Sequence, residues 1–409
     1  MNFLFKIATL YITICLFSLN IYGQKKMLDH ADFDIWNTIE GEKISPDGKY
    51  VLYSLLKGEK DHYFKLKDNK GLQVLKYDRG SKGKFSYDSK FAFFTIKSWQ
   101  DSLKELRRNK VEEKELPKDS LALYDLDQDT LTKISRVRSY KVPEKWSGLL
   151  AYQLEDALKP KKDTATVDSL KSEAITDKKK VKPDRPVNDD NGYHLVLRNL
   201  SNGETDTIKY VLNYSFAKEG LRLVISTSGQ DTTFNSQVLV YDFENEKLDT
   251  LFDAYKAKIS QLSISDLGNN IGFVADLDTT KIQIRPNELY HWKTGNSNAI
   301  KILDANALDK GKMISAYGNI QFSKDETKMY FGLSDLPILQ DTTLLTEEIV
   351  NVEVWTYDEP RLYTVQETQV KADRERSYTA VYHLSNNKML PLASKKIPNI
   401  ELGNEGNAE

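Results

Sequence analysis

A short turn sequence recurs six times along this chain, and it restricts the possible folds more than any other feature. In the first copy, Ile44 is followed by Ser-Pro-Asp-Gly-Lys and then by the alternating run Tyr-Val-Leu-Tyr, which is typical of a half-buried β-strand. A glycine at the fifth position of four copies predicts a tight turn with positive φ between antiparallel strands. The copies begin at Ile44, Phe85, Glu144, Phe216, Ile264 and Phe322, and the glycines are Gly48, Gly148, Gly220 and Gly268.

A second pattern follows each copy and predicts a β-hairpin. It consists of an alternating strand, a short polar turn such as Asn69-Lys70-Gly71, and another strand. The six predicted hairpins cover residues 64–75, 122–134, 195–208, 238–251, 289–302 and 381–392.

Together the two patterns encode four antiparallel strands about every 55 residues, which is the blade of a β-propeller. An antiparallel sandwich also contains short, regularly spaced strands, but it rarely repeats one turn at a fixed offset. The sequence therefore predicts an all-β fold, a β-propeller of four-stranded antiparallel blades over residues 44–409. The 22 tyrosines agree with this, because aromatic rings suit pleated, half-buried surfaces.

About six blades are expected, with a seventh begun. Residues 402–406 place Gly406 at the same offset as the earlier turn glycines, and the sequence ends where the next strand is due. We therefore expect a propeller that is incomplete at its C-terminus, since a ring left open keeps the apolar face of a blade in water.

Three segments interrupt or precede the repeats. Residues 24–43 are expected to form an N-terminal helix or extension, because apolar residues within 27–39 have helical spacing. Residues 99–117 read as a short helical insertion with few apolar anchors. Residues 159–191, with three consecutive lysines at 178–180, lack the apolar content to order themselves and are expected to form a disordered insertion.

Residues 1–23 resemble a secretory signal peptide, with Lys6 before an apolar run and Gly23 at the expected cleavage edge. The alternative is an uncleaved membrane anchor. Cys15 is the only cysteine and lies inside this segment, so the exported chain would have no disulfide and no thiol chemistry. We expect an exported protein, periplasmic or extracellular, without stable membrane insertion after cleavage.

Charge gives no support for nucleic-acid binding. The chain has 58 Lys and Arg against 60 Asp and Glu, and the two signs alternate without a basic stripe.

A search for reactive motifs assigns no catalytic, cofactor-binding or metal-binding residue, and no cofactor is expected. No Gly-x-Ser-x-Gly turn is present, so no serine is specifically presented as a nucleophile. Asp125, Asp127 and Asp129 match the first half of a calcium loop only, and they are better explained as a hairpin turn. The histidines lack metal-ligand spacing and stand singly at His30, His62, His194, His291 and His383.

The Ile-Ser-Pro-Asp-Gly-Lys turn at residues 44–49 and its degenerate copies resemble the N-terminal propeller of exported bacterial serine peptidases of the prolyl oligopeptidase family. The segment Val352-Glu353-Val354-Trp355, expected to lead into a long hairpin, adds to the resemblance. In that family the propeller covers a catalytic α/β-hydrolase domain. The resemblance therefore implies a peptide substrate and a hydrolase domain C-terminal to Glu409. It assigns no catalytic residue to this chain.

Three functions are compatible with the sequence. The first is the substrate-gating propeller portion of a serine peptidase, inactive by itself. The second is a freestanding exported propeller that binds a protein or peptide partner, as Tol-type propellers do, since these share the repeated turn. The third, an enzyme with its site in the propeller, has no residue spacing in its favour.

Overall fold

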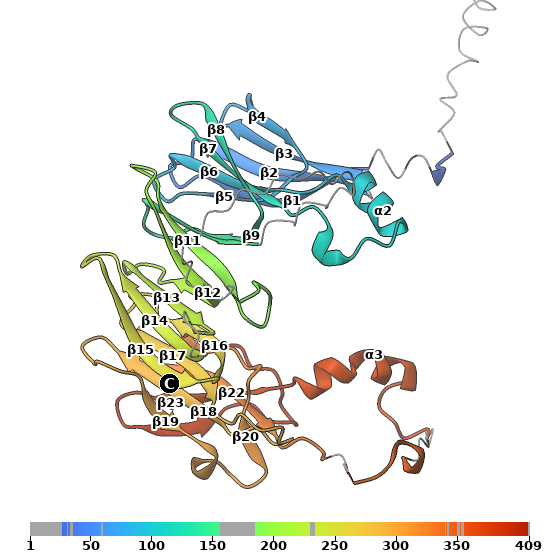
Figure 1. The fold of residues 1–409 in the computed structure, drawn as a ribbon, viewed down its shortest axis with the longest axis vertical. Helices are drawn as coiled ribbons and strands as arrows, with labels where there is room; N and C mark the ends of the chain where they lie inside the picture. The colour runs from blue at the N-terminus through green and yellow to red at the C-terminus, as the bar shows by residue number, and fades with distance from the viewer. Residues whose placement is uncertain are drawn as a thin grey trace, which may run out of the picture.

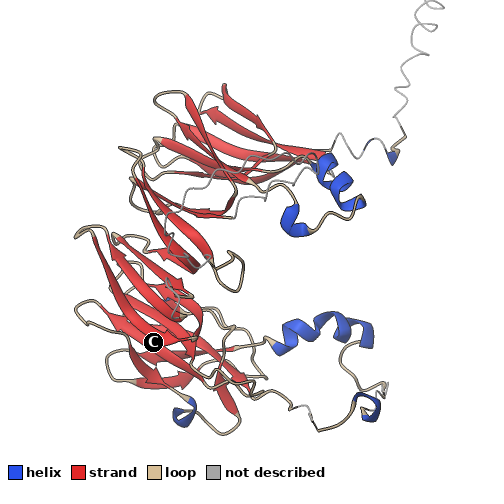
Figure 2. Cartoon of the chain, viewed as in Figure 1, coloured by secondary structure: helices blue, strands red, loops and turns tan. Residues whose placement is uncertain are grey.

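Antiparallel pairing between strands that follow one another in the chain generates almost all of this fold. The computed structural model describes residues 27–30, 32, 36–58, 60–155, 185–229, 234–339, 341, 343–349, 352 and 356–407. These residues form twenty-four strands, and the α-helices are confined to insertions (Figure 2). The all-β prediction is therefore confirmed.

The strands group into six blades in chain order (Figure 1). Blade 1 contains β1 (Thr38–Ile44), β2 (Tyr50–Lys57), β3 (Lys60–Asp68) and β4 (Gln73–Asp78), and blade 2 contains β5 (Gly80–Phe85), β6 (Phe91–Ile96), β7 (Ser120–Asp125) and β8 (Thr130–Ser135). Blade 3 contains β9 (Val137–Lys141), β10 (Leu149–Leu154), β11 (Tyr193–Asn199) and the start of β12 (Thr205–Phe216). Blade 4 contains the rest of β12, β13 (Arg222–Thr227), β14 (Asn235–Asp242) and β15 (Lys247–Tyr255). Blade 5 contains β16 (Lys258–Ile264), β17 (Asn270–Asp276), β18 (Asn287–Lys293) and β19 (Ile300–Leu303). In blade 6, β20 (Lys312–Ile314) and β21 (Gln321–Phe322) both pair with β22 (Lys328–Asp335), followed by β23 (Tyr378–His383) and β24 (Lys388–Pro391).

The first four crossovers between blades use at most two residues each, whereas residues 304–311 connect blade 5 to blade 6. Arg79, between β4 and β5, has φ +64°, and Arg136, between β8 and β9, has φ +61°. At the third crossover Tyr210, with φ +56°, lies within β12, which pairs with β11 up to Val211 and with β13 from Val211 onward. Blades 3 and 4 therefore share one seven-stranded sheet.

All six predicted turns join the innermost strand of a blade to its second strand, and all six predicted hairpins are present. Gly48, Gly148 and Gly268 have φ of +72°, +96° and +78°, as the repeat predicted. The prediction was wrong for Gly220, which does not have positive φ. A Cβ at this position would lie 2.0 Å from the carbonyl oxygen of Leu267 in the next blade. Glycine is thus required there for close backbone approach between neighbouring turns.

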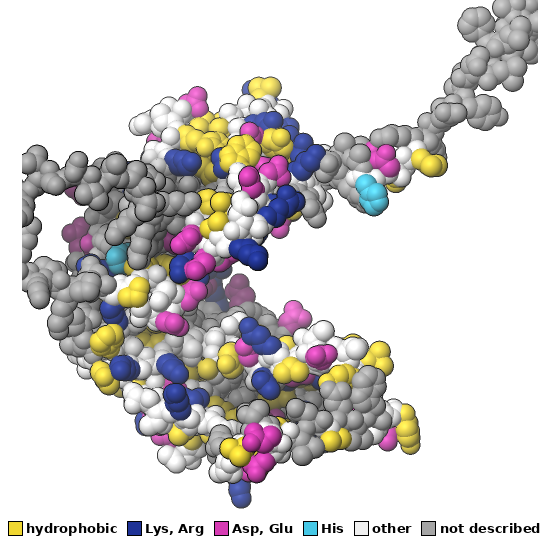
Figure 3. Space-filling model, turned by 45° about the vertical axis from the view of Figure 1, so that its right-hand side comes forward, with side chains coloured by type: hydrophobic (Ala, Val, Ile, Leu, Met, Phe, Trp, Pro, Cys, Tyr) yellow, Lys and Arg dark blue, Asp and Glu magenta, His cyan; other side chains and the backbone are white. Residues whose placement is uncertain are grey.

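The apolar core lies between blades. Each of five core clusters combines side chains of two consecutive blades, from blades 1 and 2 through to blades 5 and 6. At the first contact Phe64 of β3 stacks on Phe94 of β6, with ring centroids 4.1 Å apart. Within the described residues no such cluster joins blade 6 to blade 1. Six blades with five apolar interfaces form an open arc, hollowed between its two ends (Figure 3).

The expected seventh turn lies against blade 6. Gly406 has φ +79°, and its carbonyl oxygen accepts a hydrogen bond of 2.6 Å from the hydroxyl of Tyr330. The backbone N–H of Lys324 donates to the carbonyl of Glu405 at 3.1 Å. These contacts place the segment beside the blade 6 turn, as the repeat register predicted.

The structure of the insertions agrees with the sequence-based predictions only in part. Helix α2 (Gln100–Arg108) lies within the expected helical insertion. Most of the predicted disordered insertion lies outside the described residues, as does the predicted signal peptide.

Two expectations about flanking segments were wrong. Residues 38–43, expected to belong to an N-terminal helix or extension, belong to β1, which pairs with β2 although its own side chains are exposed. Backbone hydrogen bonds to β2 are sufficient to hold this strand in blade 1. In place of a long hairpin after residue 352, helix α3 (Tyr363–Arg374) precedes β23.

Substitution of Gly220 tests the close approach between turns. We expect Gly220→Ala to lower the free energy of unfolding by about 1–3 kcal/mol, because the added methyl group would force the blade 4 and blade 5 turns apart. Gly295→Ala is the matched control. Gly295 has φ +96° but no atom within 4 Å of the added Cβ, so only the backbone strain of roughly 1 kcal/mol applies. Urea unfolding measures both, and equal losses would contradict the contact explanation.

Candidate functional site

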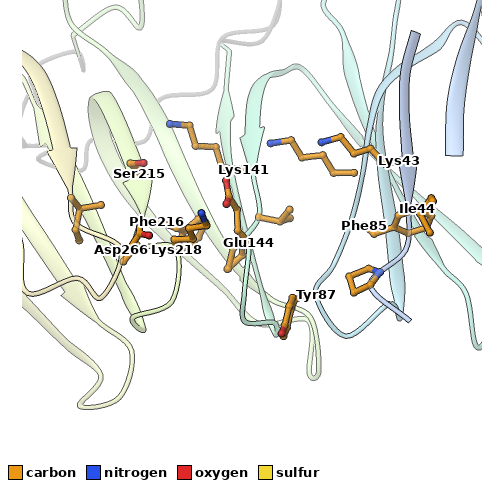
Figure 4. A pocket seen from close by; sticks show the side chains of 16 residues that line it. Lys43, Ile44, Phe85, Tyr87, Lys141, Glu144, Ser215, Phe216, Lys218 and Asp266 are labelled. Atoms are coloured by element: carbon orange, nitrogen blue, oxygen red, sulfur yellow. The ribbon is translucent and has the colours of Figure 1, made fainter. Parts of the chain in front are cut away.

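The innermost strands of the first five blades bring their ends to one central cavity of about 750 Å³. Successive blades contribute residues around the repeated turns, so side chains that are far apart in the sequence face a common space (Figure 4). The volume falls in the range of pockets that hold small ligands. Its lining includes the charged residues Lys43, Lys84, Lys141 and Glu144 and the apolar residues Ile44, Phe85 and Phe216.

Three lysines from three consecutive innermost strands line this cavity. Lys43 is on β1, Lys84 on β5 and Lys141 on β9. We refer to them as the lysine triad. In the described part of the chain, none of the three forms an ion pair with a carboxylate. Lys141 Nζ donates to the backbone carbonyl of Tyr214 and lies 4.9 Å from the centre of its ring.

The environment of Lys84 and Lys141 disfavours their positive charges. Burial lowers the pKa of Lys84, and the neighbouring charge of Lys43 lowers it further, although Glu144 acts in the opposite direction. Burial likewise lowers the pKa of Lys141, with a second contribution from Lys84. The three ammonium groups therefore act on one another, and one cavity carboxylate compensates them only in part.

The tyrosines beside the triad do not supply negative charge. The ring of Tyr140 lies 5.9 Å from Lys84 Nζ, and burial raises the pKa of its hydroxyl well above the usual value. Burial also raises the pKa of Tyr214 to about 12, although a hydrogen bond with Ser139 acts in the opposite direction. Both hydroxyls are therefore neutral at physiological pH.

Carboxylates at the edge of the cavity are engaged elsewhere. Lys324 Nζ of blade 6 lies 3.1 Å from Asp266 Oδ2 of blade 5 and 3.2 Å from Glu219 Oε1 of blade 4. Lys145 of blade 3 contacts the same Glu219 oxygen at 2.7 Å. This chain of ion pairs connects the turns of four blades, and it leaves the positive charge of the triad largely unopposed.

The cavity has the composition of a binding site. Its described lining contains four lysines, the carboxylates of Glu144 and Asp266, the hydroxyl groups of Tyr87 and Ser215, and apolar side chains, but no histidine. An arrangement of ammonium groups beside Ile44, Phe85 and Phe216 suits an organic anion with apolar parts.

The histidines singled out in the sequence are spread over separate elements. His62, His194, His291 and His383 lie on β3, β11, β18 and β23. His291 is buried, with Nε2 2.9 Å from Asn270 Oδ1, and burial lowers its pKa to about 4. It is therefore a neutral core residue.

The aspartates at 125–129 form the expected hairpin turn. Asp125 Oδ1 accepts hydrogen bonds from the backbone N–H groups of Asp127 and Gln128, at 3.0 and 2.9 Å. No group of three or more metal-ligating side chains occurs among the described residues. Nor does any helix in those residues have the length and hydrophobicity needed to cross a membrane.

The lysine triad was not predicted from the sequence, although two of its members occupy the same position in the repeat. Lys43 and Lys84 each stand immediately before a copy of the repeated turn, at Ile44 and Phe85. Equal offsets in a propeller repeat place side chains at equivalent positions in neighbouring blades. Lys141 precedes its copy by a different offset, so this signal did not identify it.

Comparison with known proteins finds similarity at the level of solved structures. No family model and no curated protein matches the chain. The β-propeller domain of the Trilobed protease from Pyrococcus furiosus is 12% identical with a TM-score of 0.37, over 88% of this chain and 86% of that one. The acylaminoacyl peptidase of Pyrococcus horikoshii is 13% identical with a TM-score of 0.38, over 90% of this chain and 48% of the peptidase. The chain thus spans about half the length of that peptidase. TolB from Acinetobacter baumannii is 10% identical with a TM-score of 0.33, over 85% of this chain and 64% of that one.

The cost of the buried charge at Lys84 can be measured. Because its pKa is lowered in the folded chain, the unfolded chain retains the proton to higher pH, and the charged lysine lowers stability at neutral pH. We expect Lys84→Met to raise the free energy of unfolding at pH 7 by roughly 0.5–1 kcal/mol. The difference from the wild type should shrink as the pH rises toward about 10.4, the ordinary pKa of lysine, because Lys84 of the folded chain loses its proton below that pH.

The control is Lys133→Met on the exposed face of β8, which should leave stability unchanged at both pH values. Urea denaturation followed by tryptophan fluorescence provides the measurement. A loss of stability in Lys84→Met at pH 7 would contradict the electrostatic account.

Proposed function

We propose that this chain is the substrate-gating propeller portion of an exported serine peptidase that hydrolyses peptide bonds in short peptides. Its catalytic α/β-hydrolase domain would lie outside these 409 residues. The observation that carries the proposal is the central cavity, to which five blades deliver lysines, carboxylates and apolar side chains. A cavity of this kind suits recognition of a substrate.

The physical role of such a propeller is size selection. A short unfolded peptide fits a passage that excludes a folded protein, so only peptides would reach the water-excluded active site behind it. Serine attack, general-base catalysis by histidine and an oxyanion hole would all come from the hydrolase domain. The repeated turn, its resemblance to peptidase propellers and the signal-like residues 1–23 support this proposal.

The intact mass of the native protein tests the proposal. An antibody raised against this chain would capture the protein from its source, and mass spectrometry would measure it. We expect a species roughly twice the 46.9 kDa of this chain, because a hydrolase domain is comparable in size to the propeller. A native species close to 46.9 kDa would overturn the peptidase proposal and favour a freestanding propeller that binds a protein or peptide.

Activity provides a second test. The purified 409-residue chain should not hydrolyse fluorogenic peptides above the rate of a heat-denatured sample, because its sequence has no nucleophile turn. Hydrolysis that copurifies with the chain and is blocked by a serine-directed inhibitor would contradict the assignment of gating to the propeller and catalysis to another domain.

A further inference from the structure

We propose that the lysine triad of the central cavity binds the carboxylate of a peptide. The inference deepens the proposed function by naming the chemical class of substrate, namely peptides that present a carboxylate to Lys43, Lys84 and Lys141. Binding itself requires only this chain, so it can be tested without the hydrolase domain.

The first argument is the arrangement of charge. Four lysines line the cavity, and the three on innermost strands, Lys43, Lys84 and Lys141, form no ion pair within the described residues. Bringing like charges together in a partly desolvated space opposes folding, and the effect remains until an anion arrives. A bound carboxylate would contact Lys84 and Lys141, which have already lost part of their hydration, together with the exposed Lys43.

The second argument is the choice of side chains. No arginine and no glycine-rich loop is found among the described residues that line the cavity, so bidentate recognition and a cradle of backbone N–H groups, two common ways of binding phosphate, are absent from this lining. Lysine ammonium groups pair readily with single carboxylates. Ile44, Phe85 and Phe216 provide apolar surface next to the charges, which suits the side chain attached to a peptide carboxylate.

The third argument is access. Glu219 and Asp266 at the edge are held by Lys145 and Lys324, so they do not form a negative barrier in front of the triad. Four lysines and two carboxylates line the cavity, and an excess of one sign of charge concentrates ligands of the other sign and increases their rate of association. The geometry therefore favours entry of a peptide with its carboxylate foremost.

A carboxylate reaches this site from either of two sources in a peptide, the α-carboxylate of the C-terminus or an Asp or Glu side chain. The experiment separates them with three fluorescein-labelled hexapeptides of otherwise equal sequence. The first has a free C-terminus and no acidic side chain, the second is its C-terminal amide, and the third is amidated and carries one Glu. Fluorescence anisotropy with the purified protein measures binding.

We expect the free acid, the amidated Glu peptide or both to bind, and the uncharged amide to bind at least tenfold more weakly. Raising the salt concentration should weaken binding of the charged peptides, because screening reduces their attraction to the triad. The double variant Lys43→Met and Lys84→Met should reduce their affinity at least tenfold, whereas Lys133→Met should leave it unchanged. Lys43 is exposed, so Lys43→Met alone provides a test if the double variant does not fold.

Equal affinity for the amide and the charged peptides would overturn the inference, as would unchanged binding to the Lys43 variant. Displacement of the peptide by inorganic phosphate at lower concentration than by acetate would also overturn it, in favour of a phosphate site. The outcome is separable from the proposed function. If the native mass is near 46.9 kDa and the protein binds carboxylates, only the peptidase proposal is wrong. If the native mass is twice that value and binding shows no preference for a carboxylate, only the present inference is wrong.

Discussion

Burial of one blade face against the next is the interaction on which this structure depends. A single four-stranded sheet cannot bury its apolar faces by itself. The core clusters accordingly lie between consecutive blades, where each blade covers a face of its neighbour. The contact between Phe273 of blade 5 and Phe252 of blade 4 is one example, with ring centroids 5.2 Å apart. Stability is then a sum over neighbouring blades, as in other repeat proteins. Each blade is positioned by the blades beside it.

The same packing determines where the cavity lies. At two crossovers a single residue of positive φ, Arg79 or Arg136, separates the last strand of one blade from the first strand of the next. Arg79 also clamps its neighbours, because its carbonyl accepts from the backbone N–H of Lys97 at 2.9 Å and its guanidinium donates to the Lys97 carbonyl at 2.8 Å. Arg136 makes the equivalent pair of bonds with Glu155, at 2.9 and 2.8 Å. Such rigid crossovers align the innermost strands and bring their ends to a common centre.

The local features of the fold were predictable from sequence, because each turn is stabilised by its own residues. Ser45 and Asp47 illustrate this, since the serine hydroxyl donates to the carboxylate at 2.6 Å and accepts from the backbone N–H of Tyr50 at 2.9 Å. Contacts between blades were not predictable in this way. Gly220 looked like another left-handed turn residue, and only the position of Leu267 in the next blade reveals the close approach. The strand at 38–43 was missed because its exposed side chains carry no burial pattern, while its backbone pairing is supplied by β2.

The candidate site could not be predicted from the sequence for the same reason. Individually, Lys43, Lys84 and Lys141 are ordinary charged residues near strand ends, and their significance arises only when blade packing places them around one cavity. The apolar interfaces on both sides hold the three strands in place, so the chain tolerates the electrostatic cost of grouping them. A repeat protein can therefore concentrate like charge at its centre while its stability resides between the blades. Selection for stability alone would remove such charges, because surface positions accommodate lysine without this cost. A bound carboxylate of the kind proposed would offset this cost.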